Sequence, residues 1–271
     1  MRGTSRGSLV SAQERLQTLL GTAGTDRAAV GDALFAVTGV LDTSASLRRA
    51  LTDPSRDGEA KAGLVVRLLQ GKVEGSVVDL VAGLARSRWA RSRDLADAVE
   101  LLAVTAEVSS AQERGELDRV EDELFRFRRT VDGDSELRAA LTDRTASGER
   151  KAALVSALLE AKVAPATLRL ARQAVLAGRG LRLDAVLTTY GEIAAKAREQ
   201  LVAHVVVALP IETAQRERLA AALQRQYGRD VHLNIDVDPD VVGGIKVEIG
   251  DEVLDGTIAR RLDDARRRLA R

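Results

Sequence analysis

The apolar residues of the chain recur every three or four positions up to about Glu199 and every second position after it. Near the N-terminus, the helical spacing predicts a helix over 8–20, which two glycines and small polar residues end at 21–25. Its apolar face is formed by Leu9, Ala12, Leu16 and Leu19. The next helix has its apolar positions at Val30, Leu34, Val37 and Leu41. The pattern therefore predicts a mainly α-helical chain that ends in a small β-containing region.

One stretch of the helical region occurs twice. LRRALTDPSRDGEAKAGLVVRLLQGKV (47–73) aligns without gaps to LRAALTDRTASGERKAALVSALLEAKV (137–163), at an offset of 137 − 47 = 90 positions, and 16 of the 27 aligned residues are identical. Identity at this level indicates that one helical unit has been duplicated. Each copy predicts a short helix, a break, an amphipathic helix and two further helices. The last two are predicted over 75–86 and 94–109 in the first copy, and over 165–177 and 183–200 in the second.

The helix predicted over 94–109 belongs to both copies. A shift of +90 places it on the last helix of the second copy, and a shift of −90 places it on the first helix of the chain. We therefore expect this helix to close the first bundle and open the second, and a loop between residues 98 and 106 would contradict the expectation. The expected domains are a first helical bundle over 1–110, a second bundle over 94–200 and a C-terminal α/β domain over 201–271.

The C-terminal region alternates apolar and polar residues. A first strand is predicted from about 202 until Pro210 stops it, and Thr213 is expected to cap a helix that ends near Gly228. Two further strands are predicted on either side of Gly243-Gly244, with Gly250-Asp251 as a tight turn after them. A basic helix over 256–270 would follow. The predicted fold class is therefore mainly α, with two tandem bundles related by internal duplication and a small β-α-β-β-α domain.

The composition narrows the possible partners and the compartment. Charged residues make up 30% of the chain, yet the formal net charge is +1, which does not favour a nucleic-acid partner. There is no cysteine, so thiol chemistry and disulfides are absent, as in proteins of a reducing compartment. No apolar run approaches the roughly 20 residues of a membrane span, and the N-terminus lacks the apolar core of a signal peptide. We expect a cytoplasmic chain that does not insert into the membrane.

The sequence contains no constellation that is typical of catalysis. It has no phosphate-binding loop, no Gly-x-Ser-x-Gly and no His-Glu-x-x-His, so no enzyme activity, cofactor or metal is predicted. His204 and His232 both fall on predicted strands, but no carboxylate or thiol is patterned to join them as a metal ligand. The arginines of the last helix would suit a solvated face, an acidic partner helix, nucleic acid or a membrane surface, and the solvated face is favoured.

One run near the C-terminus is dense in turn residues at fixed spacings. It reads VDPDVVGGIKVEIGDEVLDGTIARRL over 237–262, and it resembles the C-terminal signature of the delta subunit of bacterial F-type ATP synthase, the counterpart of the mitochondrial oligomycin-sensitivity-conferring protein. Thr257 stands where serine is more usual, which keeps the hydroxyl. The positions that carry the resemblance, interpreted as mainly structural, are Asp238, Pro239, Gly243, Gly244, Gly250, Asp251, Asp255, Gly256 and Arg261.

The resemblance covers about residues 94–271 and implies a non-catalytic stator subunit of the peripheral stalk. In that family the helical bundle holds the N-terminal helices of the alpha subunits, and the C-terminal domain holds the b subunits of the stalk. The stator resists rotor torque, so that proton flow is coupled to ATP synthesis. The location implied is peripheral, at the cytoplasmic face of the plasma membrane. The first copy is an addition to the usual plan and resembles the longer delta subunits of high-GC actinobacteria.

By family analogy, the alpha-subunit helix would bind between the first and fifth helices of a bundle. In the second copy these helices offer Leu95, Leu101, Leu102, Val108, Leu168, Leu170, Ala171 and Val175. In the first copy the equivalent residues are Leu9, Leu16, Leu19, Val78, Val81 and Leu84. Two other interpretations remain, a free-standing helical adaptor unrelated to ATP synthase and a nucleic-acid-binding protein, and the near-neutral charge argues against the second.

Overall fold

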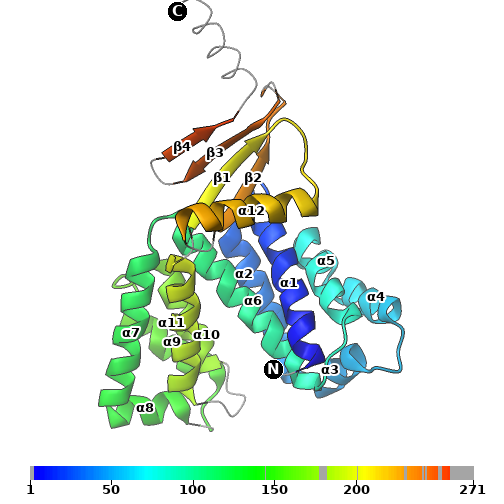
Figure 1. The fold of residues 1–271 in the computed structure, drawn as a ribbon. Coiled ribbons are helices and arrows are strands. Elements are labelled where there is room, and N and C mark those ends of the chain that lie inside the picture. The colour runs from blue at the N-terminus through cyan, green and yellow to red at the C-terminus, as the bar shows by residue number, and fades with distance from the viewer. Residues whose placement is uncertain are drawn as a thin grey trace, which may run out of the picture. The chain divides into compact units, whose positions relative to one another are not determined.

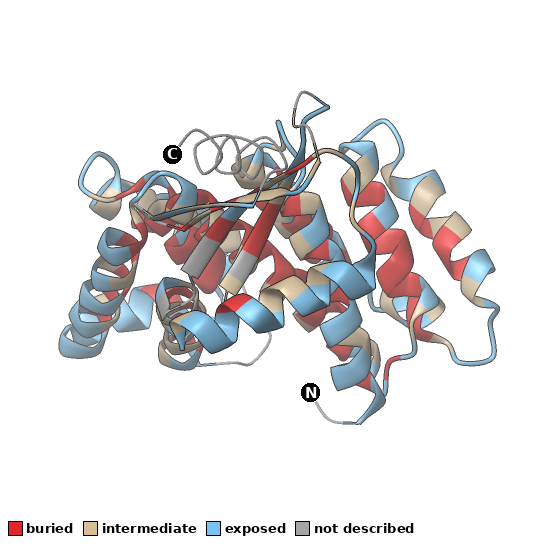
Figure 2. Ribbon diagram, turned by 45° about the horizontal axis from the view of Figure 1, so that its top comes forward, coloured by how far each residue is buried: buried red, intermediate tan, exposed pale blue. Residues whose placement is uncertain are grey.

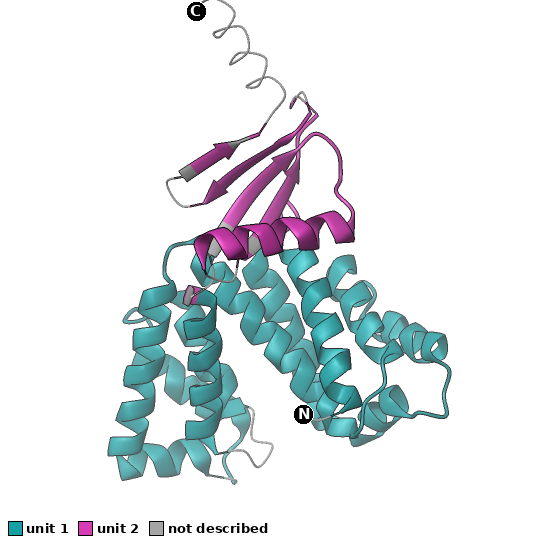
Figure 3. Ribbon diagram, viewed as in Figure 1, with its two compact units in different colours: residues 1–20, 26–197 teal, residues 21–25, 198–271 magenta. Residues whose placement is uncertain are grey.

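The structure is a computed structural model that describes residues 3–143, 145–176, 182–199, 201–228, 231–239, 241, 243–249 and 252–256. The chain forms two compact units (Figure 3). One unit comprises residues 1–20 and 26–197, and the other comprises residues 21–25 and 198–271. The first unit is helical, and the second contains a sheet and one described helix (Figure 1). The chain is thus mainly α with a small sheet near its C-terminus, as the sequence predicts.

The described helices of the first unit follow one another with short connections. They are α1 (Thr4–Leu20), α2 (Arg27–Thr43), α3 (Ala45–Thr52), α4 (Gly58–Leu69), α5 (Gly75–Arg86), α6 (Ser92–Glu113), α7 (Leu117–Gly133), α8 (Ser135–Thr142), α9 (Gly148–Leu159), α10 (Pro165–Leu176) and α11 (Leu183–Glu199). Several begin at a side-chain cap, in which an oxygen accepts from an amide that the first turn leaves free. The capping residues are Asp26, Ser44, Asp57, Asp134 and Ser147.

The bounds of four consecutive helices recur at a constant offset. Adding 90 to the first and last residues of α2, α3, α4 and α5 gives the first and last residues of α7, α8, α9 and α10 (for example 75 + 90 = 165 and 86 + 90 = 176). The offset equals that of the sequence repeat. The local signals that start and stop helices therefore agree between the two stretches.

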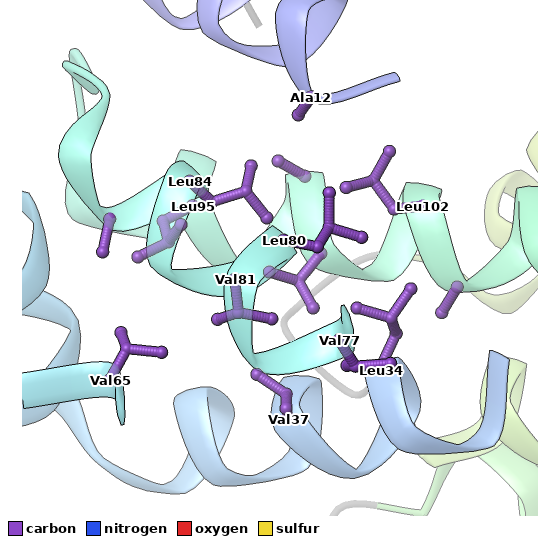
Figure 4. Packing of buried hydrophobic residues seen from close by; sticks show 14 of the residues in the cluster. Ala12, Leu34, Val37, Val65, Val77, Leu80, Val81, Leu84, Leu95 and Leu102 are labelled. Atoms are coloured by element: carbon purple, nitrogen blue, oxygen red, sulfur yellow. The ribbon is translucent and has the colours of Figure 1, made fainter. Parts of the chain in front are cut away.

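Helix α6 joins the two hydrophobic cores of the helical unit. It is one continuous helix over Ser92–Glu113, with no loop between residues 98 and 106. Leu95, Leu102 and Ala106 pack into a first core with α1 to α5 (Figure 4). Val108 and Ala111 pack into a second core with α7 to α11. Buried residues consequently lie on more than one face of α6, whereas an amphipathic surface helix would bury a single stripe. Figure 2 colours the whole chain by burial.

The second unit is built on a four-stranded mixed sheet. Its strands are β1 (Leu201–Val207), β2 (Val231–Val237), β3 (Ile245–Ile249) and β4 (Glu252–Asp255), in the order β2-β1-β3-β4. β1 pairs in parallel with β2 and antiparallel with β3, and β3 pairs antiparallel with β4. The alternation in β1 buries Ala203, Val205 and Val207 and leaves His204 exposed.

Two expectations for this unit are corrected. The β-α-β-β-α prediction lacks β4, because Glu252–Asp255 is too short to show an alternating pattern and is specified by its pairing with β3. Helix α12 (Thr213–Tyr227) takes Glu212 as its N-cap in place of Thr213, and the Gln215 side chain accepts from the Glu212 amide at 2.9 Å. Gly228 ends α12 with φ of 67°, as expected for a glycine cap. The helix predicted over 256–270 lies outside the described residues.

Candidate functional site

Most of the predicted groove residues of the second copy lie in the hydrophobic cores. Leu95 and Leu102 belong to the first core, and the others that are buried belong to the second core: Val108, Leu170, Ala171 and Val175. Leu101 on α6 and Leu168 on α10 are half-buried. Only these two of the eight side chains therefore present surface to a partner while the cores stay closed.

The first-copy equivalents show the same division. Leu16 and Leu84 are almost fully buried, as are Val78 and Val81. Leu9 and Leu19 on α1 are half-buried. Each stretch thus has two half-buried leucines, both on α1 in the first and one each on α6 and α10 in the second, and burial alone does not distinguish the two stretches.

A charge cluster around one buried carboxylate joins α2, α6 and α10. The Glu107 side chain on α6 is 0% exposed, and Arg169 on α10 donates from Nε to its Oε1 at 2.8 Å, with Nη2 2.8 Å from Oε2. Asp32 on α2 lies 3.8 Å from the same guanidinium. Gly31 makes room for the carboxylate, because a Cβ at that position would lie 2.7 Å from Glu107 Oε1. The cluster ties the first core to the second through charge as well as apolar packing.

Burial shifts the pKa of Glu107 in this cluster. Removal of Glu107 from water raises its pKa to about 7, and the nearby Asp32 carboxylate adds to the rise. The Arg169 guanidinium opposes the shift through its charge and its hydrogen bond. Desolvation is the larger effect, so the carboxyl group titrates near neutral pH.

Further polar contacts join α11 and α2 to α6. The Tyr190 hydroxyl on α11 donates to Glu100 Oε1 on α6 at 2.7 Å, in a buried position. The Arg27 guanidinium on α2 contacts Glu113 at 3.7 Å near the C-terminal end of α6. Each contact fixes the position of a helix against α6. Apolar packing alone would specify that position less well.

Sequence reasoning missed this cluster. Glu107 is the only charged residue of LLAVTAEVSSA (101–111), a run that is otherwise apolar or small. A single carboxylate in such a run is a signal for a buried, partnered charge, because isolated charges are expensive to bury. Its partner Arg169 is 62 positions away and is one of many arginines, so the pairing requires the structure.

The C-terminal signature forms a turn and a strand connection. Gly243 and Gly244 have φ of 63° and 91°, a region that glycine adopts at little cost. The Asp238 amide donates to Val207 O at 2.9 Å, and the Gly256 amide donates to Ile245 O at 2.9 Å. Gly250, Asp251 and Arg261 lie outside the described residues. The described part of the signature is thus explained by backbone geometry.

The described residues contain no group of three or more His, Asp or Glu side chains placed to hold a metal ion. No single helix in the described ranges is long and apolar enough to cross a membrane. α2 and α3 pass that test only as a pair, with a bend of 104° between them.

Comparison with known proteins matches residues 104–269 to the family described as ATP synthase delta (OSCP) subunit. The chain is 53% identical to ATP synthase subunit delta of Kineococcus radiotolerans over 268 residues, which is 99% of this chain and 97% of that protein. It is 51% identical to the same subunit of Streptomyces coelicolor, over 100% of this chain and 98% of the relative. The subunit of Thermobifida fusca is 47% identical over all of both chains.

Among solved structures, a chain of the cryo-EM structure of the Toxoplasma gondii mitochondrial ATP synthase hexamer matches 62% of this chain and 95% of that one, at 23% identity and a TM-score of 0.28. A superposition at that level carries no argument about the fold. The sequence relatives suffice, since they extend over the first helical stretch as well as the C-terminal signature. The chain belongs to the ATP synthase delta (OSCP) subunit family.

Proposed function

We propose that the chain is a non-catalytic stator subunit of the proton-translocating F-type ATP synthase. The observation that carries the proposal is the match to ATP synthase delta subunits at about half identity along nearly the whole chain. The described residues form packed helices of the kind that present binding faces. A structural connector is the role that these features favour.

We further propose its partners and its place. The helical unit would hold the N-terminal helices of the alpha subunits of the catalytic head, and the C-terminal unit would hold the b subunits of the peripheral stalk. The protein would lie peripherally at the cytoplasmic face of the plasma membrane. In this position it resists rotor torque, so that proton flow stays coupled to ATP synthesis.

For the alpha-subunit helix we propose the α6–α10 face, with Leu101 and Leu168 as its accessible anchors. An amphipathic helix binds such a face through apolar side chains spaced three or four positions apart. The other predicted groove residues support the anchors from within the cores. Charged substitution of the anchors should therefore weaken binding without opening the cores.

Co-purification tests the function and the face together. A tagged wild-type chain expressed in its own host should retain the alpha and b subunits, and a Leu101→Asp, Leu168→Asp double variant should lose alpha while keeping b. Leu158→Asp is the matched control, because this leucine of α9 is also partly exposed at 37%. Recovery of the folded wild-type chain without either subunit would favour the alternative, a free-standing helical adaptor unrelated to ATP synthase.

We also propose that the helical unit consists of two bundles related by internal duplication, over 1–110 and 94–200, that share α6, with the C-terminal domain over 201–271. Support comes from the 16 identities in 27 aligned positions and from the constant shift of 90 between helix bounds. The contribution of α6 to both cores also supports it.

A further inference from the structure

A cavity of about 500 Å³ lies between the loop before α4 and the end of α5. Its lining is strongly cationic, with Arg56, Lys61, Arg86 and Arg88, and it includes one carboxylate, that of Asp57. The volume is in the range of small-molecule sites. We propose that this cavity binds a phosphate group, with the Lys61 ammonium and the Arg88 guanidinium as its direct contacts.

Lys61 is the first reason for the proposal. The residue is 4% exposed, which is rare for a lysine. Its Nζ has a single hydrogen bond among the described residues, to Ser87 O at the long distance of 3.4 Å, and no carboxylate of the described chain lies within ion-pair distance of it. An ammonium group has three donors, and a buried charge is costly unless it is paired. An anion in the cavity would supply the missing pair.

Arg86, Arg56 and Asp57 already have partners within the chain. Arg86 is engaged by both oxygens of Glu59, and Arg56 lies 3.7 Å from Asp53. The Asp57 carboxylate accepts from backbone amides at the start of α4. The four cations and these three carboxylates give the group a net charge of 4 − 3 = +1.

Arg88 supplies the second free cation. Arg88 is among the residues that line the cavity, and no ion pair holds its guanidinium among the residues that the structure describes. The guanidinium is exposed, so a ligand can reach it from solvent. A ligand could therefore contact the exposed Arg88 first and then bind the buried Lys61.

The second helical stretch provides an internal comparison. The positions 90 residues after Arg56, Arg86 and Arg88 are occupied by Ala146, Leu176 and Gly178, so the arginines are absent there. Lys61 has its counterpart in Lys151, which is half-buried. Arg144 and Arg179 stand instead at the counterparts of Pro54 and Trp89, so the second stretch has its arginines at different positions, although the surrounding helices have the same lengths.

Phosphate is the ligand chemistry that fits. A phosphate group offers three or more acceptor oxygens to a point-charge ammonium and to the fork of an arginine. The group has two sources of different kinds, a soluble phosphate or nucleotide and the headgroup of an anionic lipid. The proposal does not depend on the stator function, because it rests on the cavity and its charges alone.

The test is calorimetric titration of the full-length chain at constant ionic strength with sodium phosphate, with ADP and with phosphatidylglycerol vesicles. We expect saturable binding of at least one of these, with a Kd on the order of 1 mM or tighter. Lys61→Met and Arg88→Gln should each weaken that binding at least tenfold. Lys151→Met is the matched control and should leave the binding unchanged. Circular dichroism melting of each variant verifies folding, and Arg88→Gln decides the test if Lys61→Met does not fold.

The three titrations distinguish a soluble ligand from a lipid headgroup. Tighter binding of ADP or of inorganic phosphate identifies a soluble ligand, and binding to vesicles alone identifies a lipid headgroup. The proposal is overturned if the wild-type chain binds none of the three saturably, or if the Lys61 and Arg88 variants bind as well as the wild type.

Discussion

Loss of the proton from the buried Glu107 should make the protein less stable as the pH rises through neutrality. Its pKa is raised by burial to about 7 in the folded state, compared with an ordinary 4.5 in the unfolded chain. A raised folded pKa means that the folded state holds the proton more tightly. The stabilisation is therefore fully present below pH 4.5 and is lost as the pH rises through 7. Between pH 5 and pH 8 the two pKa values give a loss of about 2–3 kcal/mol.

Urea unfolding at pH 5, 6, 7 and 8 measures this contribution, and Glu107→Gln is the reference. Glutamine keeps the shape and cannot ionise, so the difference in unfolding free energy between wild type and variant isolates this one group from the other titrations. We expect the wild type to lose about 2–3 kcal/mol relative to Glu107→Gln over this range. A difference that stays constant with pH, or one that grows in favour of the wild type, would refute the reasoning.

Arg169→Met tests the other half of the cluster. Removal of the guanidinium leaves the Glu107 carboxylate buried without its main partner, which typically costs about 3–5 kcal/mol when the group is charged. The cost should be smaller at pH 5, where the carboxyl group is protonated. An equal cost at pH 5 and pH 8 would mean that Arg169 stabilises the fold through its packing.

Four further substitutions test the packing, a buried hydrogen bond and the backbone conformation. Gly31→Ala should destabilise by about 1–3 kcal/mol because its Cβ would meet a buried carboxylate at 2.7 Å, whereas Gly39→Ala on the same helix meets nothing within 4 Å and should stabilise by up to about 1 kcal/mol. Tyr190→Phe removes the buried hydroxyl that donates to Glu100 and should cost about 1–3 kcal/mol in urea unfolding. Gly244→Ala should lower the melting temperature, since φ of 91° strains an alanine by about 1–2 kcal/mol; an unchanged melting temperature would contradict this.

The helices could be predicted from the sequence because their signals are local. The apolar spacing predicted helices over 75–86 and 165–177, and the structure has Gly75–Arg86 and Pro165–Leu176. Because residues 94–109 align with a helix of each copy, they were predicted to form one unbroken helix. Helix α6 is continuous over these residues.

The features that were missed depend on distant partners. β4 is four residues long and acquires its structure from β3, so no periodicity could reveal it. Most of the groove residues are buried because α6 packs into two cores at once. A single apolar stripe in the sequence does not predict that double packing. The cavity around Lys61 joins segments that are about 30 residues apart in the sequence, 52–61 and 86–89.

The central claim is that this chain holds the catalytic head of ATP synthase as part of its stator. Calorimetric titration of the full-length chain with a peptide of the alpha-subunit N-terminus from the same genome tests it most directly. The account predicts saturable binding with a micromolar or tighter Kd, which corresponds to about −8 kcal/mol. Absence of binding by a chain shown to be folded would contradict it.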